Sequence, residues 1–361
     1  MDLVRLLLVL EATRDWSVHH MDVKSAFLNR ELTEVMHMRQ PPGFVVAGEE
    51  KKVLQLRKAL YGLRQAPRAW NIKLDSTLAT LGFKKCASEH ALYTRRSKEG
   101  TLIVGVYVDD LIVTGSMQQE TDRFKAEMAA KFKMSGLGLL SYYLGIEVKQ
   151  GKQAIELCQS AYALKLLERA GLKGLIVPSW FMEDPHKDHM AAVKHLLRYI
   201  AGSYELGLAY PRRKKTSELE LIGFSDSDMG GDLDGRKSTS GMVFFLGTCP
   251  ISWHYMSRSL AEEAAGGNHG QAVAAPILRI DNKSGIELGK NPVLHSRSKH
   301  IDIKFHFIRD CVEKRQVILD QVGTSQQLAD VFTKPLGKNK FEEMKTQVGM
   351  KQPKELKLHV S

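Results

Sequence analysis

Two adjacent carboxylates interrupt an apolar segment of the chain. Residues 102–115 read LIVGVYVDDLIVTG, and this run rich in Val and Ile predicts a strand with Asp109 and Asp110 in its middle. Burying an unpaired carboxylate is costly, so these two side chains require a neutralising partner. Mg²⁺ prefers hard oxygen ligands, and two such ions stabilise both the attacking and the leaving oxygen in phosphoryl transfer. The pair therefore indicates a two-metal site.

Such a site needs one more carboxylate from a neighbouring strand. Asp22, in the segment MDVKSAF, is the candidate because it too lies in a predicted strand that ends in a turn. The alternative is that Asp109 and Asp110 form an ordinary hairpin turn. Apolar residues continue on both sides of the pair, and this context favours the metal site over the turn.

The elements that must position these carboxylates follow from the spacing of apolar residues. Two hairpins are predicted, one with SKEG at its tip and one that turns at QGKQ. A long helix begins near Gly62 and Pro67, and further helices are predicted at residues 1–15, 118–134, 160–172 and 187–202. The basic segment PRRKKTSE is the predicted linker between two domains, and two or three strands follow it.

Composition narrows the class of protein. The chain has 361 residues, enough for one large domain or two ordinary ones, and its net charge of +11 is typical of a surface that holds nucleic acid. The alternative is a merely basic globular protein.

The cysteines contain no C-x-x-C pair, which argues against a zinc ribbon and a disulfide framework. The apolar segment VRLLLVL is too short to span a bilayer. These observations favour a soluble, intracellular protein. The four cysteines are Cys86, Cys158, Cys249 and Cys311.

The order of the motifs resembles a known family. MDVKSAFLN, QPPGF, ALYGLRQAPRAW, VYVDDLIVTG and YYLGIEV follow one another, as in the reverse transcriptase of copia-type LTR retrotransposons. Further on, GFSDSDMGGDLDGRKSTSGMVFFLG, ISW, DNKSGIEL, KNPVLHSRSKHIDIKFHFIRD and QLADVFTKPL resemble the RNase H domain of that family. The resemblance implies an α+β polymerase palm, an antiparallel sheet backed by helices, followed by an RNase H-like α/β domain with a mixed sheet.

The resemblance also implies roles for residues of the first domain. Asp22, Asp109 and Asp110 would hold two Mg²⁺, and Phe27 would be the gate against a ribose 2′-hydroxyl, with a core aromatic as the alternative. Tyr61 and Gly62 would contact the incoming nucleotide and the template. Arg64 and Arg68 would contact phosphate, and Leu144 and Gly145 would contact the primer end. The two arginines could equally lie on a solvated helix face. Leu144 and Gly145 could equally belong to an ordinary hairpin.

In the second domain the resemblance implies a nuclease site with two metal ions. Asp226, Asp281 and Asp330 match three of the family's four carboxylates, and Asp228 is expected to lie outside the metal-binding set. Glu262 and Glu263 are weak candidates for the fourth carboxylate, because the Gly-rich segment around them does not suit the helix that should carry it. His295, His300 and His306 are spaced like a metal cluster, but no Cys or carboxylate partner at ligand spacing supports zinc.

The sequence departs from the family pattern in several places. The fingers region of the family lies upstream of Asp22 and is expected to be absent from this protein, and a thumb and connection segment is expected to be missing at a join near Pro178 and Trp180. The helix with the fourth nuclease carboxylate is expected to be deleted. Arg30 stands where the family usually has Gly, and a positive φ is expected there.

These observations predict a reverse transcriptase with an RNase H domain, from a degenerate or mis-spliced copy with weak or no activity. The expected partners are an RNA template, a DNA primer, an RNA–DNA hybrid and dNTPs, in a cytoplasmic particle or the nucleus, with no membrane. The alternative is a non-catalytic remnant that binds nucleic acid. The predicted domains are the palm and partial thumb at 1–177, a truncated connection and linker at 178–215, an RNase H-like domain at 216–340 and a tail at 341–361.

Overall fold

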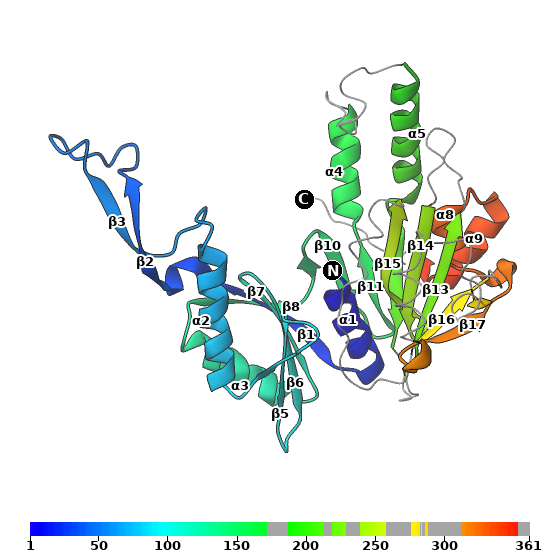
Figure 1. The fold of residues 1–361 in the computed structure, drawn as a ribbon, viewed down its shortest axis with the longest axis horizontal. Helices are drawn as coiled ribbons and strands as arrows, with labels where there is room; N and C mark the ends of the chain where they lie inside the picture. The colour runs from blue at the N-terminus through cyan, green and yellow to red at the C-terminus, as the bar shows by residue number, and fades with distance from the viewer. Residues whose placement is uncertain are drawn as a thin grey trace. The chain divides into compact units, whose positions relative to one another are not determined.

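The computed structural model describes residues 1–171, 187–212, 219–228, 239–257, 276–281, 283, 286–287 and 312–352. The chain forms two compact units, which are described separately (Figure 1). One unit is the continuous segment Trp16–Leu140. The other combines Met1–Asp15 with Ser141–Ser361.

The continuous unit is built on a six-stranded antiparallel sheet in the order β4-β5-β6-β7-β1-β8. Its strands are β1 (Ser17–Val23), β4 (Lys84–Lys85), β5 (Leu92–Arg96), β6 (Thr101–Tyr107), β7 (Asp110–Gly115) and β8 (Met134–Leu139). Two helices, α2 (Ala66–Thr80) and α3 (Gln118–Ala129), cover it, with Trp70, Phe124 and Met128 in the shared core. An antiparallel sheet backed by helices confirms the predicted palm.

A two-stranded ribbon extends this unit. Strand β2 (Glu31–Arg39) pairs with β3 (Val53–Lys58) in an antiparallel ladder, and both lie outside the six-stranded sheet. The short 3-10 helix η1 (Ala26–Asn29) connects β1 to the ribbon. Arg30 follows η1 with a φ of −121°, so the expectation of a positive φ at this position is wrong. The chain is simply extended there, a conformation that any residue adopts.

The second unit contains a sheet in the order β18-β12-β11-β10-β9. Its strands are β9 (Tyr142–Tyr143), β10 (Ile146–Gln150), β11 (Ala154–Cys158), β12 (Gly207–Pro211) and β18 (Met350–Lys351), all antiparallel. Helix α4 (Ser160–Gly171) follows β11, and α5 (Lys187–Ser203) precedes β12. The hairpin predicted to turn at QGKQ is the β10–β11 pair.

The first helix of the chain, α1 (Asp2–Arg14), packs within this second unit. Its Glu11 is fully buried and accepts a hydrogen bond from Arg212, at 3.0 Å between Nη2 and Oε1. Arg212 also pairs with Asp15, at 2.8 Å, and its Nε donates to the carbonyl of Gly151. Arg212 is therefore fixed, although the sequence placed it in the basic linker. Its contacts join the first residues of the chain to the β11–β12 sheet.

A mixed sheet in the order β15-β14-β13-β16-β17 completes this unit. Its strands are β13 (Leu221–Asp228), β14 (Thr239–Leu246), β15 (Cys249–Ser257), β16 (Ile277–Ile280) and β17 (Ile318–Gln321). The pairs β13–β14 and β14–β15 are antiparallel, whereas β13–β16 and β16–β17 are parallel. This topology confirms the mixed sheet predicted for an RNase H-like domain.

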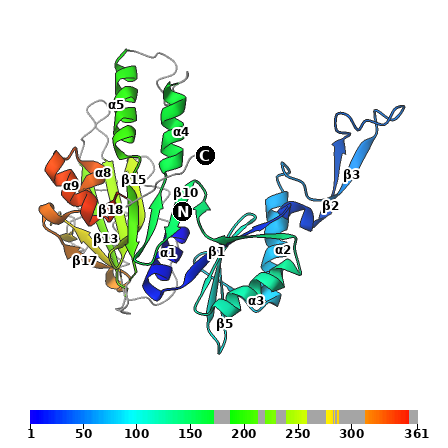
Figure 2. The ribbon, with the colours of Figure 1, turned by 180° about the vertical axis from the view of Figure 1, so that it is seen from behind.

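Two helices pack against this mixed sheet, α8 (Asp330–Thr333) and α9 (Lys338–Gln347), after the 3-10 turn η4 (Thr324–Gln326) (Figure 2). Met344 of α9 is fully buried with Phe224 and Val243 of the sheet. The sequence placed residues after 340 in a tail, but Met344 belongs to the core of the sheet domain and Met350 pairs with Leu208 in β12. Among the described helices, none has the length and apolar character needed to cross a membrane.

Candidate active sites

Backbone pairing brings two of the three predicted polymerase carboxylates together. Asp22, near the end of β1, lies opposite Asp110, the first residue of β7, in the antiparallel ladder. The amide of Val23 donates to the carbonyl of Asp109 at 2.9 Å. Directly opposed residues of an antiparallel pair point to the same face of the sheet. Asp22 and Asp110 are therefore neighbours on one face, and Asp109 lies beside them in the turn.

The apolar run from 102 to 115 is two strands and not one. β6 ends at Tyr107, β7 begins at Asp110, and these two residues pair across a two-residue turn of Val108 and Asp109. The sequence interpretation that disfavoured a hairpin turn is thus wrong. Apolar residues continue into the turn, although Tyr107 and Val108 are themselves exposed there, so hydrophobicity alone could not reveal the break. The turn is itself what exposes the carboxylates at a sheet end.

The turn holds an unusual backbone conformation. Val108 has a φ of 58°, in the left-handed region that β-branched residues rarely adopt. The indole Nε1 of Trp70 donates to the carbonyl of Val108 at 2.6 Å, and Trp70 is buried under the turn. Strained residues of this kind persist where the surroundings fix them, and they concentrate at functional sites.

Each polymerase carboxylate has a polar partner. Lys24 Nζ lies 2.7 Å from Oδ2 of Asp22, and His20 Nε2 lies 2.7 Å from Oδ1 of Asp110. The hydroxyl of Tyr61 donates to Oδ2 of Asp109 at 3.3 Å. Sequence reasoning missed His20 and Lys24. The two-residue period of a strand could have found His20, since it places His20 on the same face as Asp22.

Tyr61 contacts Asp109, and Phe27, another of the predicted nucleotide-binding residues, packs against Tyr61. Phe27 is 6% exposed, and its ring centroid lies 4.3 Å from that of Tyr61. Burial and then the charge of Asp109 raise the pKa of the Tyr61 phenol, so it remains a hydrogen-bond donor at neutral pH. Gly62 has a φ of +94°, and a Cβ built there would meet no atom within 4 Å. Open space therefore lies over Gly62, and Arg64 and Arg68 are exposed nearby in the chain.

Leu144 and Gly145 form the two-residue turn between β9 and β10, in the other unit. Tyr143 and Ile146 pair across this turn, and both turn residues have a positive φ, 48° for Leu144 and 85° for Gly145. The side chain of Leu144 is exposed. A leucine in the left-handed region is uncommon, which makes this turn a second place of backbone strain. Its role at the primer end stays a prediction.

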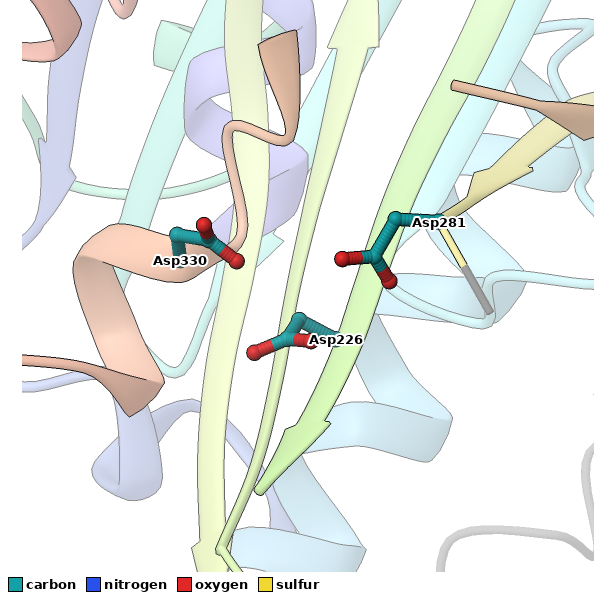
Figure 3. A group of neighbouring side chains, drawn as sticks. All are labelled: Asp226, Asp281 and Asp330. Carbon is teal, nitrogen blue, oxygen red and sulfur yellow. The ribbon is translucent and has the colours of Figure 1, made fainter. Parts of the chain in front are cut away.

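Three carboxylates converge in the mixed sheet domain. Asp226 near the end of β13, Asp281 directly after β16 and Asp330 at the start of α8 point toward one another (Figure 3). One carboxylate oxygen from each lies within 4.8 Å of the others. Among the described residues, this is the group of three whose ligand atoms come close enough to share a metal ion. The oxygen donors suit a hard divalent cation, and the sequence predicted all three.

Thr333 and Lys334, which follow Asp330 in the chain, complete the surroundings of this triad. Thr333 Oγ1 donates to Oδ2 of Asp226, and Lys334 Nζ lies 2.7 Å from Oδ1 of Asp330. Burial raises the pKa of the Asp330 carboxyl, an effect that Lys334 opposes and the neighbouring aspartates reinforce. Burial tends to lower the pKa of Lys334, but the hydrogen bond to Asp330 and the other carboxylates outweigh it and raise that pKa. Sequence reasoning missed Lys334, although it stands four residues after Asp330.

Several predicted residues lie outside the part of the chain that the structure describes. They are Glu262, Glu263, His295, His300, His306, the segment around Pro178 and Trp180, and the side chain of Asp228. The expected loss of the fourth nuclease carboxylate, with Glu262 and Glu263 as weak candidates, and the argument against zinc at the three histidines therefore stay predictions.

Comparisons with known proteins identify the family. Residues 1–178 match the family described as reverse transcriptase (RNA-dependent DNA polymerase). The chain is 31% identical to the retrovirus-related Pol polyprotein from transposon RE1 of Arabidopsis thaliana, over 96% of this chain and 28% of the relative. It is 30% identical to the corresponding polyprotein from transposon TNT 1-94 of Nicotiana tabacum, over 96% of this chain and 32% of the relative. The chain thus spans about a third or less of these relatives.

The length of the first alignment bears on the predicted deletions. It contains 417 positions, more than the 361 residues of the chain, so the relative has internal residues without a counterpart here.

Among solved structures, a foamy viral protease-reverse transcriptase in complex with RNA/DNA hybrid matches 94% of this chain and 46% of that chain, at 11% identity and a TM-score of 0.48. The match of residues 1–178 and the relatives that align over most of the chain show that it belongs to the copia-type retrotransposon polyproteins, in their reverse transcriptase region and the adjoining C-terminal segment.

Proposed function

We propose that this chain is the RNA-directed DNA polymerase and RNase H part of a copia-type retrotransposon polyprotein. The observation that carries the proposal is the pairing of Asp22 with Asp110 beside the turn residue Asp109, within the segment that matches the reverse transcriptase family. Carboxylates gathered at one end of a sheet are the arrangement that metal-assisted phosphoryl transfer requires.

The nuclease triad fits a divalent metal, because one carboxylate oxygen of each aspartate lies within 4.8 Å of the others. The polymerase carboxylates are neighbours through the β1–β7 ladder and the adjoining turn, but their oxygens do not form such a group in this structure. Asp22, Asp109 and Asp110 would hold Mg²⁺ in the first unit, and Asp226, Asp281 and Asp330 in the second. When bound, Mg²⁺ supplies Lewis-acid stabilisation of the charge that develops on the phosphoryl oxygens. His20, Lys24 and Tyr61 keep the first set of carboxylates oriented through their hydrogen bonds and ion pairs.

Substrate selection would depend on residues around Asp109. The buried Phe27 ring, held against Tyr61, would exclude a ribose 2′-hydroxyl and so favour dNTPs. The open space over Gly62 would admit the base pair that forms, and Arg64 and Arg68 could meet phosphate because both are exposed. The net charge of +11 supports binding of an RNA template, a DNA primer and their hybrid through phosphates.

Primer extension tests the polymerase. The full chain is incubated with a primed RNA template, dNTPs and Mg²⁺, beside Asp110→Asn and the control Asp122→Asn. Asp122 is exposed on α3 of the same unit and carries the same charge. We expect weak extension at most, equal in the wild type and in Asp122→Asn, and none by Asp110→Asn. Template binding without extension by folded wild-type protein would favour a non-catalytic nucleic-acid-binding protein instead.

Hybrid cleavage tests the nuclease separately. The same protein is incubated with an RNA–DNA hybrid labelled in the RNA strand, beside Asp226→Asn. We expect cleavage that depends on Asp226, because this buried carboxylate is one of the three that converge. Equal cleavage by both proteins would assign the activity to a contaminant and remove support for this site.

A further inference from the structure

The ammonium group of Lys334 lies among the nuclease carboxylates. Its Nζ is 2.7 Å from Oδ1 of Asp330, 3.4 Å from Oδ1 of Asp226 and 3.9 Å from Oδ2 of Asp281. The same three residues bring carboxylate oxygens within 4.8 Å of one another. The lysine and a metal ion would therefore draw on the same set of acceptor oxygens.

The fold fixes the base of this lysine. The backbone amide of Lys334 donates to the carbonyl of Asp330 at 2.9 Å, which closes the last turn of α8. Helix α8 packs tightly on β14, because a Cβ built on Gly241 would lie 2.8 Å from Cβ of Phe332 and 3.1 Å from the carbonyl oxygen of Ala329. The position of Lys334 beside the triad thus follows from the packing of its helix.

The side chain nevertheless has a route away from the triad. Asp226 and Asp330 have side chains that are 6% exposed, whereas that of Lys334 is 37% exposed. A partly exposed lysine can turn its ammonium group into water while its Cα stays in place. The carboxylates of Asp226 and Asp330 cannot move in the same way, since they are buried near the end of β13 and at the start of α8.

Electrostatics makes the two cations competitors. Three clustered carboxylates repel one another, and one ammonium group neutralises part of their charge. A divalent cation on the same oxygens would be repelled by an ammonium group about 4 Å away. We propose that Lys334 is an internal counter-ion of the nuclease triad, which must leave its carboxylates for a divalent cation to bind and thereby weakens metal binding. This inference rests on the proposed nuclease function of the triad.

The test measures Mg²⁺ binding and not cleavage. Isothermal titration with Mg²⁺ is carried out on the full chain with Asp110→Asn in every protein, which weakens the contribution of the polymerase site. The variants are Lys334→Met, Lys334→Arg and the control Lys338→Met. Lys338 is exposed at the first residue of α9, so its substitution removes the same charge at a distance from the triad.

We expect Lys334→Met to bind Mg²⁺ about tenfold more tightly than the parent protein. Lys334→Arg keeps the positive charge beside the triad, and Lys338→Met keeps Lys334. The Mg²⁺ affinity of both variants should therefore stay within about twofold of that of the parent. Adding Asp226→Asn to Lys334→Met should abolish the gain in Mg²⁺ affinity, which would show that the additional binding takes place at the triad. Mg²⁺ binding by Lys334→Met that is equal to or weaker than that of the parent would overturn the inference, as would a parent and variant that both fail to bind.

Thermal unfolding gives a second readout that does not depend on activity. In EDTA, Lys334→Met should unfold at a lower temperature than the parent, because the carboxylates lose their counter-ion. Added Mg²⁺ should raise its unfolding temperature by more than it raises that of the parent. An equal rise in both proteins would contradict the inference.

Failure of this inference and failure of the proposed function are distinguishable. Tighter Mg²⁺ binding by Lys334→Met in a chain that does not cleave a hybrid would support the counter-ion and reject the nuclease. Cleavage that depends on Asp226, with Mg²⁺ affinity unchanged by Lys334→Met, would support the nuclease and reject the counter-ion.

Discussion

Asp22 lies opposite Asp110 in the ladder between β1 and β7, and their carboxylates share one face of the sheet. Because side chains alternate along a strand, a slip of one residue would move one of the two carboxylates to the other face. The site thus depends on the register of β1 against β7. Buried residues on these strands, Val18 and Met21 on β1 with Leu111 and Val113 on β7, fix that register.

Phe27→Val should weaken discrimination against ribonucleotides. The ring of Phe27 is held against Tyr61, and a smaller side chain would open the space where a 2′-hydroxyl must fit. We expect the ratio of rNTP to dNTP incorporation to rise at least about tenfold in primer extension. Phe83→Val is the matched control, since Phe83 is 5% exposed in the same core and lies after α2. An equal rise in both variants would mean that core loosening, and not the gate, is responsible.

Val108→Gly should not destabilise the palm. The positive φ of Val108 costs about 1–2 kcal/mol for a β-branched residue, and glycine adopts it freely. The side chain is 41% exposed, so little burial is lost. We expect the free energy of unfolding in urea to be unchanged or higher by about 1 kcal/mol.

Val106→Gly provides the comparison for that turn. Val106 is partly buried against the core on β6, and its φ is not positive, so the glycine should cost more than about 1 kcal/mol. Equal losses at positions 106 and 108 would show that the backbone of Val108 stores no strain.

Gly241→Ala should impair the nuclease site through packing. The added methyl group would meet Phe332, Thr333 and the carbonyl of Ala329 within 3.1 Å, so α8 must shift from β14. We expect a loss of about 1–3 kcal/mol in the free energy of unfolding and reduced hybrid cleavage, since Asp330 moves with α8. Gly202→Ala in α5, where a Cβ meets no atom within 4 Å, should cause neither loss. Hybrid cleavage by Gly241→Ala at the wild-type rate would show that nuclease activity does not depend on the packing of α8 against β14.

Glu11 should make stability depend on pH. Burial, opposed by Arg212, raises the pKa of Glu11 from 4.5 to about 8. Because the folded state holds this proton more tightly than the unfolded state, the contribution is complete below pH 4.5 and is lost as the pH rises toward 8. Over that range the free energy of unfolding of the wild type should fall by up to about 1.4 kcal/mol per pH unit relative to Glu11→Gln.

Urea unfolding at several pH values from 5 to about 8.5 checks this dependence. Gln keeps a hydrogen-bonding group beside Arg212 but cannot titrate, which makes Glu11→Gln the matched reference. A constant difference between the two proteins across this range would show that Glu11 keeps one protonation state throughout.

The sequence predicted local features well and distant contacts poorly. The alternation along β1 and the amphipathic spacing of α3 located these elements, because each pattern repeats within a few residues. The same signal failed at the turn of Val108 and Asp109, where the apolar run continues from one strand into the next. Lys334 escaped notice because two of its three partners, Asp226 and Asp281, are distant in the chain and meet it only through the mixed sheet. Asp226, Asp281 and Asp330 were found through the family resemblance, since no local pattern links them.

The division of the chain between the two units has a consequence for synthesis on the ribosome. All residues of the Trp16–Leu140 unit are contiguous, and its ends are close, since the amide of Leu140 donates to the carbonyl of Val18. This unit can fold as soon as it emerges. Helix α1 is made before this unit but must wait, because Arg212, the partner of its buried Glu11, is translated about 200 residues later. The apolar residues of α1 therefore stay exposed to chaperones, or to misfolding, until Arg212 has been translated.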